Sequence, residues 1–162
     1  MTALKHTIFT ALFTVLLAMG SASSLMAQSD QQIAQEVMAL ARAQWQAAIA
    51  QRPVAETMKD VSDEYTEFDR GIPTRIDGKA MNMAFAEAYA GGGGRLVAAD
   101  MANPKVQVYG DVAILSYNFV GANMSADGVV EPSLAKSTRV YAKIDGRWQL
   151  VHANFGSADD ID

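Results

Sequence analysis

The spacing of apolar residues changes near residue 90, from a helical period to a strand period. Before this point apolar positions recur every three or four residues, which is typical of helices packed on one face. After the glycine run 91–94, apolar and polar residues alternate, which is typical of strands. Three N-terminal helices followed by an antiparallel sheet predict an α+β fold, in which the helices cover one face of the sheet.

The helical part of the sequence divides into three segments. Ser29 begins a capping box, and the first helix is expected to end at Arg52, because the residue before a proline is disfavoured in a helix. A short second helix is predicted from about Pro53 to Asp60. In the third segment four apolar residues recur at helical spacing, which predicts a third helix. They are Met81, Phe85, Ala88 and Tyr89.

The glycine run 91–94 is expected to end the third helix as a flexible connection. A phosphate-binding loop would follow a strand and precede a helix, and here the order is reversed. A short irregular strand is predicted at 65–68, because Tyr65 and Phe68 are three apart and face opposite sides. Five further strands are predicted after the glycines. They are Arg95–Met101, Lys105–Tyr109, Val112–Val120, Ser133–Ile144 and Trp148–Phe155, joined in part by the tight turns Gly110-Asp111 and Asp145-Gly146 and by a longer loop around 125–128.

The N-terminus has the pattern of a secretory signal peptide. Lys5 precedes an uncharged apolar run, Ile8 to Met19, which is shorter than the roughly 20 residues that a membrane-spanning helix needs. We expect cleavage after Ala27, with cleavage after Ala22 or Ser24 as alternatives, and export to the periplasm or out of the cell. An uncleaved anchor helix is the competing interpretation.

Composition narrows the range of functions. The chain has no cysteine, which excludes disulfides and thiolate metal sites. Its formal net charge is −5 and its basic residues are scattered singly, which disfavours nucleic acid as a partner. Without a basic amphipathic helix, calmodulin is not an expected partner either. We divide the chain into a signal peptide (1–27), one domain (28–156) that has no membrane segment, and an acidic tail (157–162).

Three segments, 103–111, 113–117 and 138–152, carry a resemblance to a known family. The last is the most specific, because Trp148 follows the Asp145-Gly146 turn and His152 lies four residues later. These segments resemble the sheet of the association domain of calcium/calmodulin-dependent protein kinase II and of SnoaL-like bacterial proteins, in the nuclear transport factor 2-like superfamily. The resemblance implies a cone-shaped fold: a strongly bent antiparallel sheet packed on three N-terminal helices, with a central pocket.

The resemblance implies two classes of function. Association domains are assembly modules, whereas some relatives carry out isomerase, dehydratase or cyclase chemistry in the pocket without a cofactor. The sequence lacks the motifs of a kinase catalytic domain and the spacing of a metal site, so no kinase activity, cofactor or metal is expected. We expect a homo-oligomer that binds a small, carboxylate-bearing ligand. An acid/base enzyme of the SnoaL-like type, whose catalytic residues are unknown, is the alternative.

Arg139 is the first candidate for ligand binding. It shares one face of its predicted strand with Tyr141, and the matching arginine of the association domain faces the cavity. There it would hold a carboxylate or a phosphate through two hydrogen bonds. A dry, unpaired guanidinium is costly, so we expect an anion or water beside it in a largely apolar cavity. The alternative is a surface arginine in a cross-strand ion pair.

The other candidates complete this predicted site. Met83 and Phe119 stand where the family has further arginines, which makes the pocket more apolar. Tyr65 and Tyr117 would donate hydrogen bonds to a ligand carbonyl, and His152 is either a general base or a structural histidine. An enzyme would also need a pocket carboxylate. The candidates for it, by location alone, are Glu67, Asp69 and Asp100.

Overall fold

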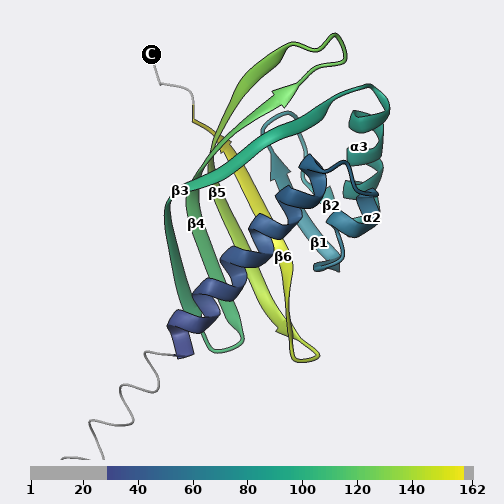
Figure 1. The fold of residues 1–162 in the computed structure, drawn as a ribbon. Coiled ribbons are helices and arrows are strands. Elements are labelled where there is room, and N and C mark those ends of the chain that lie inside the picture. The colour runs from purple at the N-terminus through teal and green to yellow at the C-terminus, as the bar shows by residue number, and fades with distance from the viewer. Residues whose placement is uncertain (1–28, 159–162) are drawn as a thin grey trace, which may run out of the picture. The chain divides into compact units, whose positions relative to one another are not determined.

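The computed structural model describes residues 29–158 of the chain (Figure 1). The predicted signal peptide, with its cleavage sites, and the last four residues of the acidic tail lie outside the described residues. The chain divides into two compact units, residues 1–33 and 34–162, and the fold below is that of the second. No helix of the described part is long and apolar enough to cross a membrane.

Six strands form one curled, mixed sheet. Its elements are β1 (Val61–Asp69), β2 (Ile76–Asp77), β3 (Arg95–Tyr109), β4 (Val112–Met124), β5 (Val130–Ile144) and β6 (Arg147–Ser157), in the order β2-β1-β6-β5-β4-β3. All neighbours are antiparallel except β1 and β6, which are parallel. Three helices accompany the sheet: the first helix (29–49), α2 (Val54–Thr57) and α3 (Lys79–Gly91). The predicted α+β fold is confirmed, and the sheet is open rather than closed (Figure 1).

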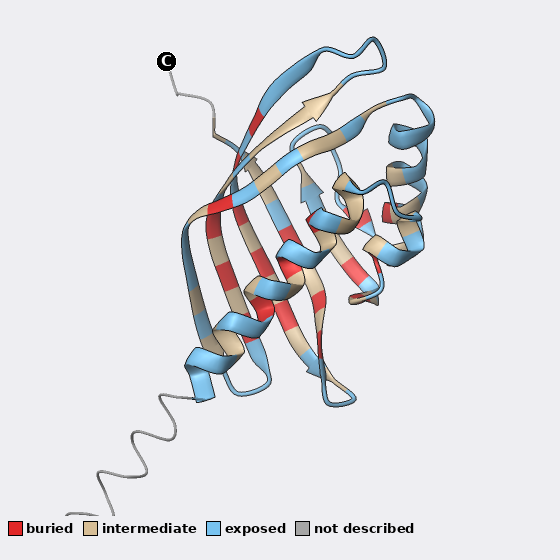
Figure 2. Ribbon diagram, viewed as in Figure 1, coloured by how far each residue is buried: buried red, intermediate tan, exposed pale blue. Residues whose placement is uncertain are grey.

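The core lies between the first helix and the concave face of the sheet. Val37, Ala41 and Trp45 recur every four residues on this helix and are buried. Figure 2 shows the buried positions of β4, β5 and β6 gathered under the helix. The tilted ring of Trp45 lies 5.7 Å from that of Tyr117, centroid to centroid, which ties the helix to β4. The N-terminal helix therefore closes the face on which Arg139 and its neighbours lie.

The first helix ends at residue 49, before the predicted Arg52. Gln51 has a φ of 54°, and its N–H donates to the carbonyl of Ala48, while the N–H of Arg52 donates to that of Ala47. This is the hydrogen-bond pattern of a Schellman termination with a left-handed residue. The second helix is also shorter than predicted, since α2 ends at Thr57 and residues 58–60 form a turn into β1.

The third predicted helix is confirmed as α3, and its apolar stripe is exposed. Met81, Phe85 and Tyr89 are 50%, 47% and 51% exposed, and the helix's buried residue is Asn82. The side of α3 that faces β1 is thus held by a polar contact, described below, and the apolar stripe lies outside. The glycine run ends α3 as predicted.

Apart from their ends, β4, β5 and β6 agree with prediction, whereas the short strand β2 lies where turns were expected. β3 is a single strand, interrupted by a register shift between Ala102 and Lys105 rather than by a loop. β1 is longer than predicted, but it has the expected irregularity, and its Tyr65 is buried while Phe68 is 47% exposed. The turn between β5 and β6 has two consecutive left-handed residues, as tight hairpins of this composition do.

Candidate functional site

Arg139 lies at the centre of the concave face. On β5 it is paired with Leu115 of β4 and Ala153 of β6, both fully buried. Strand alternation directs all three side chains to the same side of the sheet, toward the first helix. The side chain of Arg139 is consequently buried, with only 5% of the residue exposed. The predicted inward orientation of Arg139 is confirmed.

The Arg139 guanidinium has neutral partners. Its Nε donates to the hydroxyl of Tyr117 at 2.9 Å, and its Nη1 donates to Oε1 of Gln44 at 2.6 Å. Its central carbon lies 5.6 Å from the ring centre of Trp45 and 5.5 Å from that of Phe155, both within cation–π range. No carboxylate of residues 29–158 lies within ion-pairing distance. The cross-strand ion pair, the alternative drawn from the sequence, is absent from this part of the chain.

Burial alone would lower the pKa of Arg139, but the oxygens of three surrounding tyrosines offset it, so that the pKa lies above its ordinary value. The three are Tyr117, Tyr141 and Tyr65. Burial also raises the pKa of Tyr65 and Tyr141, and the positive charge of Arg139 opposes both shifts. At neutral pH the cluster is therefore one cation surrounded by neutral hydroxyls.

Of the three candidate acids, Glu67 is the one that has the contacts expected of a pocket carboxylate. Its Oε2 accepts hydrogen bonds from the hydroxyl of Tyr65 at 2.5 Å and from Nδ2 of Asn82 at 2.9 Å. Burial raises the pKa of Glu67, and repulsion from Asp69 adds to this, whereas the two donors and the charge of Arg139 oppose it. The sequence identified Glu67 only by location. Its spacing of two from Tyr65 was the signal that places it on the same face.

The other two acids have local structural partners. A carboxylate oxygen of Asp69 accepts from the N–H of Gly71 at 2.7 Å, and one of Asp100 accepts from the N–H of Met101 at 2.8 Å. Asp100 is exposed. Both carboxylates thus stabilise a turn or a strand, and neither contacts Arg139. No group of three His, Asp or Glu side chains that could hold a metal occurs within residues 29–158.

The structure brings some of the predicted ligand-binding residues together and separates others. Tyr65, Tyr117 and Tyr141 surround Arg139, as the electrostatic couplings above indicate. Phe119 is one step further along β4 and packs edge-on against Trp45, with ring centres 5.5 Å apart. Met83 is half-buried on α3, and no contact joins it to the described cluster.

His152 does not belong to this cluster. It pairs with Thr66 and Val140, whose side chains point away from the Arg139 face, and its Nδ1 lies 2.8 Å from the hydroxyl of Thr66. The cause is a register shift between β5 and β6 at Val140/Tyr141, which breaks the alternation along β6 so that Leu150 and Ala153 are both buried. Sequence alone gave no signal for this irregularity.

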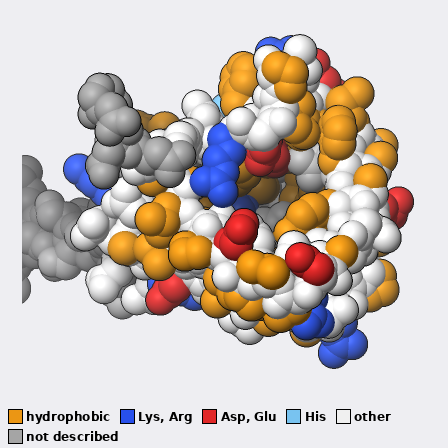
Figure 3. Space-filling view, turned by 90° about the horizontal axis from the view of Figure 1, so that it is seen from above, with side chains coloured by type: hydrophobic (Ala, Val, Ile, Leu, Met, Phe, Trp, Pro, Cys, Tyr) orange, Lys and Arg blue, Asp and Glu red, His pale blue; other side chains and the backbone are white. Residues whose placement is uncertain are grey.

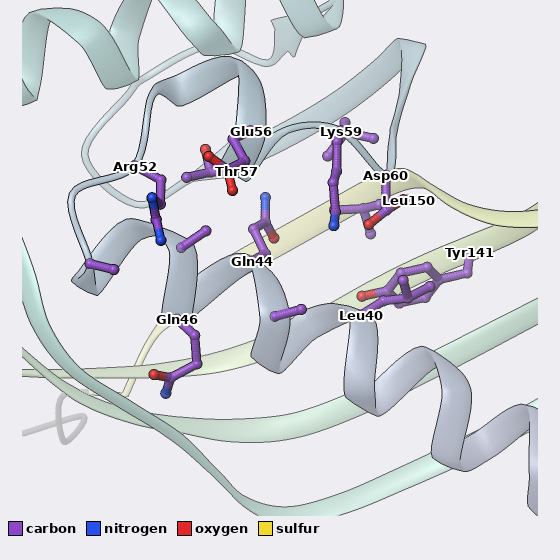
Figure 4. A pocket seen from close by; sticks show the side chains of 14 residues that line it. Leu40, Gln44, Gln46, Arg52, Glu56, Thr57, Lys59, Asp60, Tyr141 and Leu150 are labelled. Carbon is purple, nitrogen blue, oxygen red and sulfur yellow. The ribbon is translucent and has the colours of Figure 1, made fainter.

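A cavity of about 380 Å³ reaches the cluster from the side of the first helix (Figure 4). Gln44 and Tyr141, both beside Arg139, line it, together with Leu40 and Leu150. Figure 4 shows Gln44 near the middle of the cavity and Tyr141 at one side. Its charged residues are Arg52, Glu56, Lys59 and Asp60.

This cavity is more polar than the predicted one. Of the four side chains expected to line the pocket (Met83, Phe119, Tyr117 and Tyr141), only Tyr141 lines it. Gln44 was missed, because a glutamine on an amphipathic helix has no distinguishing pattern. The molecule is also hollowed at the end seen in Figure 3, where hydrophobic side chains surround the opening and basic and acidic ones stand at its rim.

Comparison with known proteins agrees with this geometry. The family model described as calcium/calmodulin dependent protein kinase II association domain matches residues 33–158. None of the curated proteins compared with the chain matches it.

Solved structures of similar fold include three at low sequence identity. The association domain of the kinase from C. elegans is 20% identical with a TM-score of 0.62, covering 80% of this chain and 98% of that one. The kinase II hub homology domain of Chlamydomonas reinhardtii is 24% identical with a TM-score of 0.63, covering 78% and 99%. A nuclear transport factor 2-like protein of unknown function from Pseudomonas putida KT2440 is 19% identical with a TM-score of 0.66, covering 82% and 91%.

Proposed function

Since the chain belongs to the calcium/calmodulin dependent protein kinase II association domain family, we propose that it is an exported, self-associating protein that binds a small carboxylate at Arg139. The observation that supports ligand binding is that the Arg139 guanidinium is buried and has no carboxylate partner within residues 29–158. A buried charge is stabilised best by an opposite charge, and neutral acceptors satisfy it only in part.

Gln44 is the residue that a ligand would replace as the hydrogen-bond acceptor of Arg139 Nη1. Its Oε1 accepts from Arg139, while its Nε2 donates only to the thioether of Met58 at 3.5 Å, a weak acceptor. Rotation of Gln44 therefore costs one good hydrogen bond, which a ligand carboxylate re-forms with a full charge. Because Gln44 lines the 380 Å³ cavity and Arg139 does not, a ligand in that cavity would reach Nη1 once Gln44 has rotated away. Tyr141, which also lines the cavity, would contact the rest of the ligand.

The binding proposal is tested by calorimetric titration with propionate and benzoate, using propionamide and benzamide as uncharged controls. The acids should bind and the amides should bind far more weakly. Arg139→Lys should weaken binding of the acids about tenfold or more, because lysine keeps the charge but loses the planar fork of donors. Its melting temperature should also fall, because lysine does not reproduce the hydrogen bonds of Arg139 to Tyr117 and Gln44. Equal binding of acids and amides, or of the wild type and Arg139→Lys, would contradict the proposal.

Gln44→Glu is the matched second variant. It places an internal carboxylate at the atom that now accepts from Arg139 Nη1. The buried cation then has its own counter-ion, so the melting temperature should rise while the acids lose their site. Undiminished binding of the acids to Gln44→Glu would show that they bind elsewhere.

Self-association is supported by the names of the similar structures, which are an association domain and a hub homology domain. This chain has, in addition, exposed apolar side chains on the outer face of its sheet, among them Val120 and Leu134.

Export is supported by the sequence of the first 27 residues. Mass spectrometry of the protein from the periplasm should give a chain that begins at Gln28, whereas an intact chain in the cytoplasm would contradict export.

Acid/base catalysis has less support than binding. Glu67 is a half-buried carboxylate of the kind that an isomerase would need, but one of its oxygens already accepts two hydrogen bonds, from Tyr65 and Asn82. Neither the family nor the contacts of Glu67 identify a reaction for it. Binding therefore stays the proposed function of the concave face.

A further inference from the structure

A second cavity, of about 690 Å³, lies where the ends of several elements meet. Its walls come from the end of the first helix, α2, the last turns of α3, the glycine run, the start of β3 and the loop between β4 and β5. It shares Arg52 and Thr57 with the cavity beside Gln44, but none of its lining residues contacts Arg139. Its volume is within the range of about 300–1,000 Å³ that small-molecule sites occupy.

The glycines, predicted only as a flexible connection, shape one wall of this cavity. Gly93 has a φ of 84°, and a Cβ built on it would lie 2.8 Å from the Cβ of Ala126 in the β4–β5 loop. A Cβ on Gly94 would clash with the ring of Tyr89. The N–H groups of Gly93 and Gly94 are bonded to carbonyls of α3. The close approach of these segments therefore requires glycine, and it holds the wall in a defined conformation.

The residues that line this cavity are mostly apolar, and the charged ones among them are all positive. Most of its side chains are small or aliphatic, such as Ala86, Leu96 and Met124. The lining includes no aspartate or glutamate, although the chain has 18 acidic residues against 13 lysines and arginines. Its two charged residues are Arg52 and Arg95. The local charge is thus opposite to the net charge of the protein.

Neither arginine has a carboxylate partner within residues 29–158. The one side-chain contact of Arg95 in this part of the chain joins its Nη2 to the sulfur of Met124 at 3.0 Å. Sulfur of this kind is a weak acceptor, so the guanidinium is available to a stronger one. Two unpaired cations beside an apolar cavity favour a ligand with an anionic head and an apolar body.

We propose that this cavity binds an amphipathic monoanion, a carboxylate on an alkyl chain. The chain lies against the wall formed by the glycine run and Ala86, and the carboxylate accepts hydrogen bonds from Arg95 and Arg52. This site is distinct from the one proposed at Arg139, because other arginines bind the carboxylate, although Arg52 lines both cavities.

The test is calorimetric titration of the purified protein with decanoate, using decan-1-ol and decyltrimethylammonium as neutral and cationic controls. Decanoate should bind about tenfold more tightly than either control, since charge-assisted hydrogen bonds are lost with both. Arg95→Gln, a change at an exposed side chain, should weaken decanoate several-fold and leave the melting temperature unchanged. Ala90→Phe should fill the cavity and remove binding.

Two reciprocal measurements separate this site from the proposed one. Arg139→Lys should leave decanoate binding unchanged, and Arg95→Gln should leave propionate binding unchanged. If Arg139→Lys abolished decanoate binding while Arg95→Gln did not alter it, the ligand would lie at Arg139 and the inference would be overturned. Equal affinity for decanoate and decan-1-ol, or no binding of decanoate, would overturn it as well.

Discussion

Arg139 and Glu67 occupy the same concave face, yet the two ionisable groups do not form an ion pair. Each is hydrogen-bonded to neutral neighbours: Arg139 to Tyr117 and Gln44, and Glu67 to Tyr65 and Asn82. Their charges still interact, since Arg139 lowers the pKa of Glu67 in opposition to the effect of burial. Proton binding at Glu67 is therefore linked both to folding and to the charge of the cluster.

Glu67→Gln should make stability less sensitive to pH. Because burial raises the pKa of Glu67, the folded chain holds this proton more tightly than the unfolded chain. The resulting stabilisation is complete below the ordinary carboxyl pKa and is lost as the pH rises through the raised one. A glutamine keeps an oxygen for both donors and has no proton to lose.

The measurement is the melting temperature of wild type and variant from about pH 4 to about pH 8. The melting temperature of the variant, relative to that of the wild type, should rise as the pH rises. Glu64→Gln, on the same strand but exposed, is the control and should follow the wild type. A constant difference between Glu67→Gln and the wild type across this range would contradict the raised pKa.

Residues on strands could be placed from the sequence, and those on helices could not. Arg139, Tyr141 and Tyr117 follow from the period of two, which fixes a side chain's face once one neighbour is known to be buried. Gln44 and Asn82 lie on helices whose polar residues carry no such marker, although both contact the site. His152 was misplaced because one register shift moved it to the other face.

At the scale of elements, turn chemistry was a reliable signal, whereas amphipathicity indicated the buried face of the first helix but not that of α3. The Asp145-Gly146 hairpin was predicted by its composition, which suits two left-handed residues in succession. The third helix was predicted correctly as a helix, but its apolar stripe is exposed, and its buried contact is made by Asn82. An apolar stripe shows that a helix has a face to cover, and it does not say what covers it.

The end of the first helix provides a test of backbone strain. Gln51 is in the left-handed region, with a φ of 54°, where a side chain is unfavourable and glycine is not. Gln51→Gly should therefore stabilise the domain by roughly 1 kcal/mol. Chemical denaturation measures the difference, and Gln46→Gly, inside the same helix, is the control that should destabilise by a similar amount. Destabilisation by Gln51→Gly would mean that the helix does not end in this conformation.

At the scale of the whole molecule, the sheet has two faces of different character. The concave face carries the core and the Arg139 cluster under the first helix. On the other face, Val120 of β4 and Leu134 of β5 are paired directly across the strands and are 45% and 44% exposed. Nothing within residues 34–158 covers this pair, and an uncovered apolar surface on a sheet commonly marks a contact with another protein chain.

We expect a second copy of the chain to cover this pair, and charged residues should then prevent association. The double variant Val120→Lys, Leu134→Glu places opposite charges at directly paired positions, which contributes about 0.2–1 kcal/mol to the sheet and so keeps the domain folded. Light scattering at micromolar concentration should show an oligomer for the wild type and a smaller species for the variant. Circular dichroism should show the same fold in both.

The control is Arg75→Ala, which removes an exposed ion pair with Asp77 elsewhere on the surface and should leave the oligomer intact. A wild type that is strictly monomeric would exclude self-association, and an oligomer unchanged by the double variant would place the contact on another face.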